Sequence, residues 1–208
     1  LGTFSEGRLE LSEIHRFNTG FMRLPTRYPI LESRSSEPDS SLVWDFLRFW
    51  YEIKFSMCQA KKQGQLSSMG VDTWGVDFAL LDKKGALIGY PYHYRDSRTD
   101  GMLKEAFSRL ARERIYDITG IQFMQFNTLY QLLAMQNMDH PALSIADKLL
   151  MVPDLINYWL TGKAVSEFTE ATTSQIFDTK KGEWSQAIIQ SMCFPQHIFP
   201  EIIQPGTL

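Results

Sequence analysis

The order in which strand-like and helix-like segments follow one another constrains the fold of this chain more than any other feature. Two short strand-like segments, at residues 1–4 and 9–17, flank the turn-forming pair Glu6-Gly7 and predict a hairpin. Helix-like segments alternate with later strands, so the sequence predicts the α/β class, with a mixed sheet flanked by helices. The later strands are expected at residues 67–72, 76–82, 86–90 and 146–152.

The longest helix-like segment runs over residues 40–62, where apolar side chains recur at three- and four-residue steps. A polar cap within residues 39–41 is expected at its start, and Gly64 is expected to end it. Prolines and serines predict a loop over residues 23–39, and residues 82–85 (DKKG) predict a tight turn between two strands. Other helices are expected at residues 100–112, 127–137, 153–162, 172–177 and 185–192.

Charge and composition argue against several classes of function. The 208 residues carry 21 basic and 24 acidic side chains, a formal net charge of −3, and no basic patch of the kind that nucleic acid requires. No apolar run approaches the ~20 residues that span a bilayer. Cys58 and Cys193 stand alone, which is typical of reduced thiols in a cytoplasmic protein. The four histidines are scattered, so no metal site is predicted.

Common nucleotide-binding and hydrolase motifs are missing from the sequence, which has no GxGxxG, GxxxxGK[ST], HExxH or GxSxG. Three aspartates, Asp72, Asp77 and Asp82, are spaced five apart. On an extended strand an odd spacing places neighbours on opposite faces, so no carboxylate pair is predicted. Asp82 is interpreted as a turn residue, whereas Asp72 ends a predicted strand.

Residues 70–82, with the sequence GVDTWGVDFALLD, form the first of three segments whose side chains suit a polyol. Gly75 permits a tight turn or the close approach of a ligand to the backbone. Trp74 offers a flat apolar face and one N–H donor, which match the C–H face and the hydroxyls of a sugar. The alternative interpretation is a tryptophan packed in the core beside a glycine that forms a bend.

Residues 92–101 (YHYRDSRTDG) form the second segment, a charged loop between a predicted strand and a predicted helix. Arg95 and Arg98 are placed to pair with Asp96 and Asp100 and so to fix the loop. The alternative is a solvated loop that caps the following helix.

Residues 119–130 (TGIQFMQFNTLY) form the third segment and mix aromatic rings with side-chain amides. Amides both donate and accept hydrogen bonds, so Asn127 and its glutamine neighbours match hydroxyl groups. The alternative is that Asn127 caps a helix while Phe123 and Phe126 pack in the core.

Together with LLMVPDLINYWLTGK and TEATTSQIFD farther along, these segments occur in an order and spacing that closely resemble the rhamnulokinase branch of the FGGY carbohydrate kinases. The resemblance covers residues 1 to at least 184. It implies that residues 1–208 form a ribonuclease-H-like (actin-like ATPase) domain, the sugar-binding N-terminal domain of such a kinase. The implied reaction transfers the γ-phosphoryl group of ATP to L-rhamnulose, yields L-rhamnulose 1-phosphate and requires Mg²⁺.

The same resemblance implies which residues touch the sugar, in falling order of expectation Gly75, Trp74, Asn127, Tyr94 and Phe126. The family's phosphate-binding DxG hairpin and HDTAS-like motif have no counterpart in this sequence, so the catalytic aspartate is expected beyond Leu208. We therefore expect a domain truncated at both ends, without the C-terminal ATP-binding domain, without catalytic residues or metal ligands, and inactive as a kinase by itself.

Two alternatives stay open at this point. One is another FGGY sugar kinase, fuculokinase-like or autoinducer-kinase-like, because one or two hydroxyl contacts decide the sugar's stereochemistry. The other is a non-catalytic carbohydrate-binding module built on the same fold, because ribonuclease-H-like domains host several functions.

Overall fold

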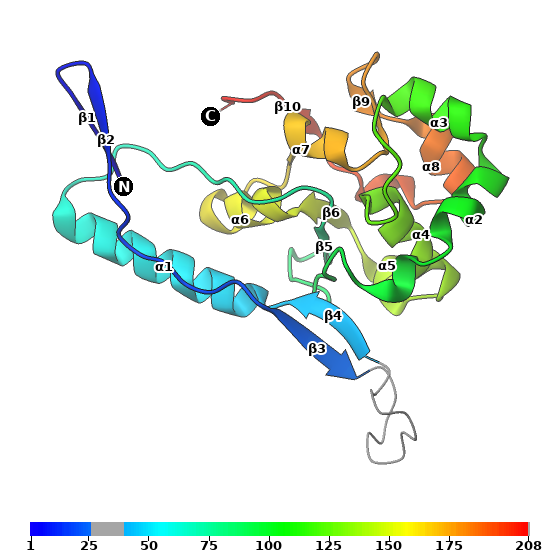
Figure 1. Ribbon diagram of the computed structural model, residues 1–208, viewed down its shortest axis with the longest axis horizontal. Helices are drawn as coiled ribbons and strands as arrows, with labels where there is room; N and C mark the ends of the chain where they lie inside the picture. Colours follow the sequence, from blue (N-terminus) through cyan, green and yellow to red (C-terminus); the bar gives the residue numbers. More distant parts are fainter. Residues whose placement is uncertain (26–39, 208) are drawn as a thin grey trace.

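Two strands from distant parts of the chain, β5 (Phe78–Leu81) and β6 (Lys148–Met151), form the antiparallel pair at the centre of the molecule. The computed structural model describes residues 1–25 and 40–207 (Figure 1). Within these residues the strands form five separate pairs, four antiparallel and one parallel. The other pairs are β1 (Gly2–Ser5) with β2 (Arg8–Leu11), β3 (Phe21–Pro25) with β4 (Ser40–Trp44), β7 (Ser166–Glu167) with β10 (Ile202–Ile203), and β8 (Phe177–Asp178) with β9 (Glu183–Trp184).

The central pair is apolar on both faces, as expected for strands that are covered on both sides. Phe78 and Leu80 point into one hydrophobic cluster, which holds buried residues of the helices between residues 102 and 145 and between residues 168 and 192. Ala79 and Leu81 point into a second cluster, which includes Trp44 and the first turn of the longest helix. The pair β5–β6 therefore separates two hydrophobic cores.

Eight α-helices surround this pair in the described residues, and they differ in how much of their surface is covered. In α4, every residue from Thr128 to Met135 is buried, so this helix runs through the core and not along its edge. The helices are α1 (Phe46–Gln63), α2 (Met102–Arg109), α3 (Arg112–Thr119), α4 (Thr128–Asn137), α5 (Pro141–Ile145), α6 (Val152–Thr161), α7 (Phe168–Thr173) and α8 (Gln186–Met192). Two short 3-10 turns lie at Ser97–Thr99 and Gln196–Ile198.

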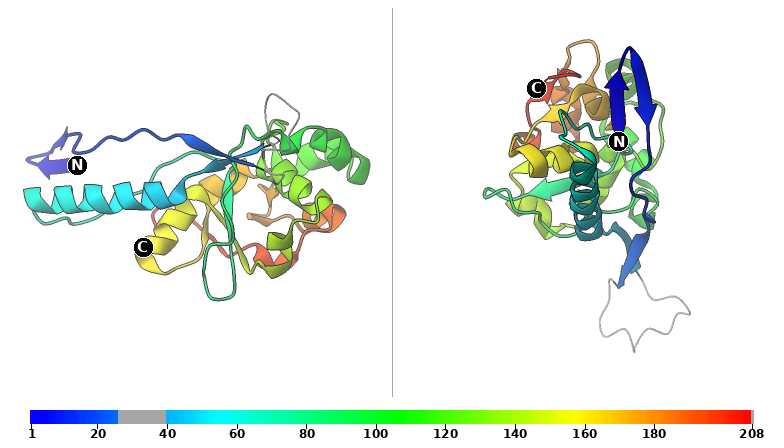
Figure 2. Two further views of the ribbon diagram at one scale, coloured as in Figure 1. Left: turned by 90° about the horizontal axis from the view of Figure 1, so that it is seen from below. Right: turned by 90° about the vertical axis from the view of Figure 1, so that its left-hand side faces the viewer.

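Helix α1 projects from the body of the molecule, and the β1–β2 hairpin lies beside its far end (Figures 1 and 2). Only the first turns of α1 enter the second cluster, through Phe46 and Phe49. The hairpin strands are exposed along their whole length, and Phe4 is 74% exposed. We refer to the hairpin and α1 together as the N-terminal arm.

Several predicted elements are confirmed. The N-terminal hairpin forms with its turn at Glu6 and Gly7, although its second strand ends at Leu11 and not at residue 17. Helix α6 has a proline in its first turn and ends at Gly162, whose φ of 79° favours glycine. The tight turn over residues 82–85, the strand β6 and the helices α4 and α8 also form where the sequence predicts them.

The predicted start of the long helix is wrong, because residues 40–44 pair with β3 as a strand. Asp45 caps the helix instead, accepting a hydrogen bond from the backbone N of Arg48 at 3.0 Å. The apolar periodicity continues through both elements, so long-range strand pairing decides the boundary.

Two predictions concern residues that the structure does not describe. Of the predicted loop over residues 23–39, the first part belongs to β3 and the rest lies outside the described residues. Leu208 also lies outside them. The catalytic aspartate expected beyond Leu208 stays a prediction, because none of the 208 residues tests it.

Four other predictions are corrected. Residues 67–72 form no strand, because no neighbouring strand pairs with them, and residues 86–90 contribute only a bridge from Leu87 to Leu81. The helix expected over residues 100–112 is split into α2 and α3 by extended backbone at Leu110. The helix expected over residues 172–177 instead ends at Thr173. Its start is set earlier by Glu167, whose carboxylate accepts from the backbone N of Thr169.

Candidate functional site

The turn before β5 is the most strained part of the backbone near the predicted sugar site. Val76 has φ of 69°, a conformation that a β-branched residue rarely adopts, and the backbone N of Asp77 donates to the carbonyl of Gly75 at 2.9 Å. Strain of this kind persists only where the surroundings hold it in place, and it clusters at functional sites. No sequence signal predicts it, because a positive φ is expected at glycine and not at valine.

Residues of two helices hold this turn, one through the carbonyl of Val76 and the other through its backbone N–H. The Thr128 hydroxyl, at the start of α4, donates to the carbonyl of Val76 at 2.7 Å. The Thr173 hydroxyl, at the end of α7, accepts from the backbone N of Val76 at 3.1 Å. A Cβ atom added to Gly75 would lie 2.9 Å from Oγ1 and Cγ2 of Thr173, so the glycine is required by the close approach of α7.

Directly after the turn, Asp77 is completely buried and accepts several hydrogen bonds. Its Oδ2 accepts from the indole Nε1 of Trp44 at 2.6 Å, from the indole Nε1 of Trp74 at 3.0 Å and from the backbone N of Tyr94 at 3.2 Å. Its Oδ1 accepts from Nε2 of Gln131 at 2.8 Å. Burial raises the pKa of Asp77, while the hydrogen bonds from these side chains oppose the rise.

Aromatic rings from three segments meet around this carboxylate. Trp74 is half-buried, and its ring lies 4.4 Å from that of Trp44, measured between centroids. Tyr94 stacks on His93 at 4.5 Å and meets the edge of Phe126 at 5.7 Å. The structure thus brings four of the five predicted site residues, Trp74, Gly75, Tyr94 and Phe126, into one region. Trp74 combines partial packing with partial exposure, and a sugar contact by Trp74 stays a prediction.

The fifth predicted residue, Asn127, follows Phe126 but has a different environment. It is buried, and its Nδ2 donates to the carbonyl of Gln122 at 3.0 Å and to Oε1 of Gln175 at 3.1 Å. Asn127 occupies the N-cap position of α4 without a side-chain cap hydrogen bond, so the capping interpretation is wrong. A sugar contact by Asn127 stays a prediction.

Of the ion pairs predicted for the charged loop over residues 92–101, the structure shows the one between Arg98 and Asp96. Arg98 lies 3.3 Å from Asp96, and both side chains are buried. Its Nη2 donates to Oε1 of Gln131 at 2.6 Å. Asp96 also accepts from the backbone N of Leu42 at 2.6 Å, which ties the loop to β4. The loop is therefore fixed from within and not merely solvated.

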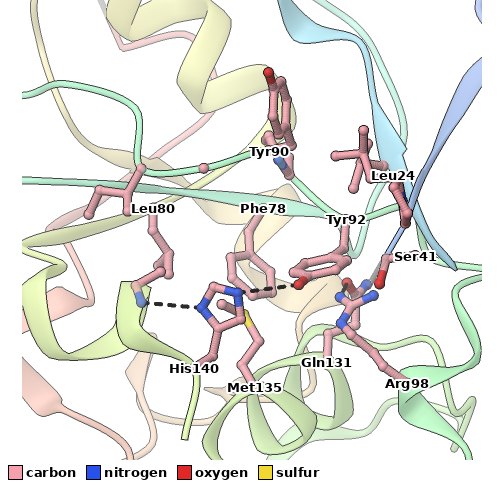
Figure 3. A pocket seen from close by; sticks show the side chains of 16 residues that line it. Leu24, Ser41, Phe78, Leu80, Tyr90, Tyr92, Arg98, Gln131, Met135 and His140 are labelled. Atoms are coloured by element: carbon pink, nitrogen blue, oxygen red, sulfur yellow. Dashed lines mark hydrogen bonds between the residues drawn. The ribbon is translucent and has the colours of Figure 1, made fainter. Parts of the chain in front are cut away.

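A cavity of about 270 Å³ is lined by Arg98 together with Tyr92, Gln131 and His140 (Figure 3). The Arg98 guanidinium lies over the ring of Tyr92 at 3.9 Å, and the Tyr92 hydroxyl is 3.2 Å from Nε2 of His140. Burial lowers the pKa of His140. None of the five predicted sugar residues lines this cavity. Gln131, which does line it, also donates to Asp77 and to the carbonyl of Phe126 and so links the cavity wall to the predicted site.

Three carboxylates, Asp154, Glu167 and Glu170, gather where α6 meets β7 and α7. Burial raises the pKa of Asp154 to about 7 and that of Glu170 to about 7, and the neighbouring carboxylates add to both shifts. Among residues 1–25 and 40–207, no group of three or more His, Cys, Asp or Glu side chains is arranged to hold a metal ion. In the same part of the chain, none of the helices combines the length and the hydrophobicity that a membrane span requires.

Comparisons with known proteins agree on one family. Residues 32–207 match the N-terminal domain of the FGGY family of carbohydrate kinases. The chain is 38% identical to a rhamnulokinase of Oceanobacillus iheyensis over its whole length, which is 41% of that relative. It is also 38% identical to a rhamnulokinase of Pectobacterium atrosepticum over 95% of the chain and 37% of the relative. The chain thus spans about two fifths of the curated relatives it matches.

Solved structures share the fold at low sequence identity. A ligand-bound xylulose kinase from Lactobacillus acidophilus superposes with a TM-score of 0.75 at 19% identity, over 90% of this chain and 36% of that one. A glycerol kinase from Plasmodium falciparum with ADP superposes with a TM-score of 0.69 at 13% identity, over 82% of this chain and 36% of that one. The predicted α/β, actin-like fold class is therefore confirmed, although the strands of the described residues form separate pairs and not one mixed sheet.

Proposed function

The chain belongs to the FGGY family of carbohydrate kinases, and from this premise we propose that it forms the sugar-binding part of an ATP-dependent kinase that phosphorylates L-rhamnulose to L-rhamnulose 1-phosphate in rhamnose catabolism. The relatives named rhamnulokinase, at 38% identity along the whole chain, support the choice of sugar. The carrying observation is the strained turn at Val76, held by two helices beside the half-buried ring of Trp74.

The chemistry of this region suits the binding of a ketose. Trp74, Tyr94 and Phe126 supply apolar ring surface for the C–H faces of the sugar, from three segments linked through shared contacts. A rigid binding surface serves phosphoryl transfer, because a kinase gains most of its rate from positioning and from charge stabilisation. We propose Gly75 and Asn127 as further sugar-binding residues.

The co-substrate ATP and the ion Mg²⁺ belong to the proposed reaction of the whole kinase. Bound Mg²⁺ neutralises charge on the transferred phosphoryl group. The described residues hold no group of three or more His, Cys, Asp or Glu side chains placed to bind a metal ion, and we propose that the role of this chain is to bind and orient the ketose. Cys58 and Cys193 are free and exposed, in keeping with the proposed cytoplasmic location.

Substitution of Trp74 tests the proposed site. We expect Trp74→Ala to weaken the binding of L-rhamnulose by about 1–3 kcal/mol, because the stacked ring area is lost. The measurement is titration calorimetry, with thermal unfolding of the same samples. Trp50→Ala, which removes another half-buried indole from α1, is the matched control and should leave the dissociation constant unchanged. A lowered unfolding temperature with unchanged binding would show that Trp74 only packs.

A panel of ketoses and an ATP turnover assay separate the remaining alternatives. We expect L-rhamnulose to bind more tightly than L-fuculose, L-ribulose or D-xylulose, and we expect the 208 residues by themselves to turn over no ATP. A preference for another ketose would point to a different FGGY sugar kinase. Clear ATP turnover would show that the phosphate-binding and catalytic groups lie within these residues.

A further inference from the structure

A row of hydrogen bonds runs from Arg98 through Gln131 to Asp77, and the charged groups at its two ends fix the direction of each bond. Gln131 connects Arg98 to Asp77: its Oε1 accepts from Arg98, and its Nε2 donates to Asp77 and to the carbonyl of Phe126, each at 2.8 Å. The carbonyl of Val76, at 3.2 Å from the same nitrogen, shares one of these two hydrogens. An arginine only donates hydrogen bonds and an ionised carboxylate only accepts them. The Gln131 amide therefore has one favourable orientation. Every group that contacts the Asp77 oxygens donates a hydrogen bond, so the ionised form of Asp77 fits these contacts, although burial raises its pKa.

The groups that Asp77 holds are the groups that the proposed sugar site uses. Its Oδ2 fixes the indole of Trp74 and the backbone of Tyr94. Its partner Gln131 fixes the carbonyls of Val76 and Phe126. Hydrogen bonds to an ionised acceptor are shorter and stronger than those to a neutral one. A buried charge thus orients one face of the site without facing the ligand itself.

We propose that Asp77 is a positioning residue for sugar binding, which orients Trp74 and Tyr94 through charge-assisted hydrogen bonds and transmits the fixed polarity of Arg98 through Gln131. The inference rests on the proposed function, because it assumes that these rings contact the ketose. A role in stability alone is the competing explanation, and the two explanations differ in what they predict for ligand binding.

The substitution Asp77→Asn separates them. Whichever way the new amide turns, its NH2 group faces either the indole and backbone donors or Nε2 of Gln131. We expect L-rhamnulose to bind about ten-fold more weakly, as loss of a hydrogen bond to a charged group implies. We also expect a reduced near-ultraviolet circular dichroism signal from the indoles. An unchanged dissociation constant and an unchanged indole signal, with only a lower unfolding temperature, would overturn the inference.

Two tryptophans that bind the same oxygen provide a matched pair. Trp44→Phe and Trp74→Phe each remove one indole N–H bond to Oδ2 of Asp77 and retain an aromatic ring. We expect Trp74→Phe to weaken L-rhamnulose binding, and Trp44→Phe mainly to lower the unfolding temperature. Equal weakening of L-rhamnulose binding by both variants would contradict a specific role in orienting Trp74.

Moving the negative charge from residue 77 to residue 131 provides a rescue experiment. In the double variant Asp77→Asn with Gln131→Glu, the new amide oxygen accepts from Trp74 while the NH2 group donates to the new carboxylate, which also accepts from Arg98. We expect this variant to regain part of the lost affinity, although the carbonyls of Val76 and Phe126 lose their donor. No gain over Asp77→Asn would contradict the proposed polarity. If Asp77→Asn alone does not fold, the affinity of the double variant is compared with that of the unaltered chain. A double variant that folds but binds no L-rhamnulose would then contradict the proposed polarity.

Failure of the proposed function is distinguishable from failure of this inference. If the unaltered chain binds no L-rhamnulose, the proposed function fails, and the indole signal of Asp77→Asn then decides whether Asp77 orients the rings. If the unaltered chain binds L-rhamnulose and Asp77→Asn binds it equally well, the proposed function stands and the positioning role fails.

Discussion

Single residues show most clearly which parts of the site were readable in the sequence. The sequence predicts that Trp74, Gly75, Tyr94 and Phe126 belong to one site, and the structure brings them into one region. Asp77 was missed, because its spacing along a strand indicated only that it does not pair with the neighbouring aspartates. The available signal was local: an indole and a carboxylate three residues apart across a turn meet at 3.0 Å.

At Gly75 the structure predicts a packing conflict. Gly75→Ala is expected to lower the free energy of unfolding by about 1–3 kcal/mol, because the new methyl group presses on Thr173. In a Thr173→Ala background the added cost of Gly75→Ala should be smaller, since Oγ1 and Cγ2 are gone. Denaturant unfolding of the four proteins gives the coupling energy. Strict additivity would show that Thr173 does not determine the need for glycine.

At the scale of elements, segments with local signals were predictable and segments that depend on a distant partner were not. Helix α6 follows from the proline in its first turn and from Gly162, whereas β4 follows only from its pairing with β3 and its hydrogen bonds to the charged loop. The strand predicted over residues 67–72 is wrong for the same reason, because a strand-like sequence forms no strand without a neighbouring strand to pair with.

The observed start of α1 gives a test at this scale. Asp45→Ala is expected to lower the free energy of unfolding by about 1 kcal/mol, because the N-cap hydrogen bond to the backbone N of Arg48 is lost. Asp45→Asn retains the acceptor and should cost much less. Thermal or urea unfolding measures both. If the two variants were equally stable, Asp45 would not be the cap.

At the scale of the whole molecule, the structure consists of two cores and the N-terminal arm. The two cores are hidden in the sequence, because a fully apolar strand does not reveal that its two faces enter different clusters. The gathering of Asp154, Glu167 and Glu170 was equally invisible, because it depends on how β7 and α7 meet α6.

These carboxylates predict how stability depends on pH. The pKa of Asp154 is about 7 in the folded chain and about 3.9 in an unfolded one. Between these values the folded chain binds more protons, so this group lowers the free energy of unfolding as pH rises from about 4 to about 7. Glu170 acts in the same direction.

The Asp154→Asn variant isolates this effect. We expect its unfolding temperature to fall less than that of the unaltered chain as the pH is raised from about 5 to about 8, since the titrating group is gone. Asp139→Asn, at an exposed aspartate whose φ of 48° also suits asparagine, is the control and should follow the unaltered chain. Parallel pH profiles for all three proteins would contradict the prediction.

The apolar character of both faces of β5–β6 has a consequence for redesign. A larger side chain at Ala79 would shift the backbone that also carries Phe78 and Leu80, so crowding on one side would open a void on the other. Substitutions in one hydrophobic cluster are therefore not independent of substitutions in the other. Neutral change in one compartment is expected to require a compensating change in the other.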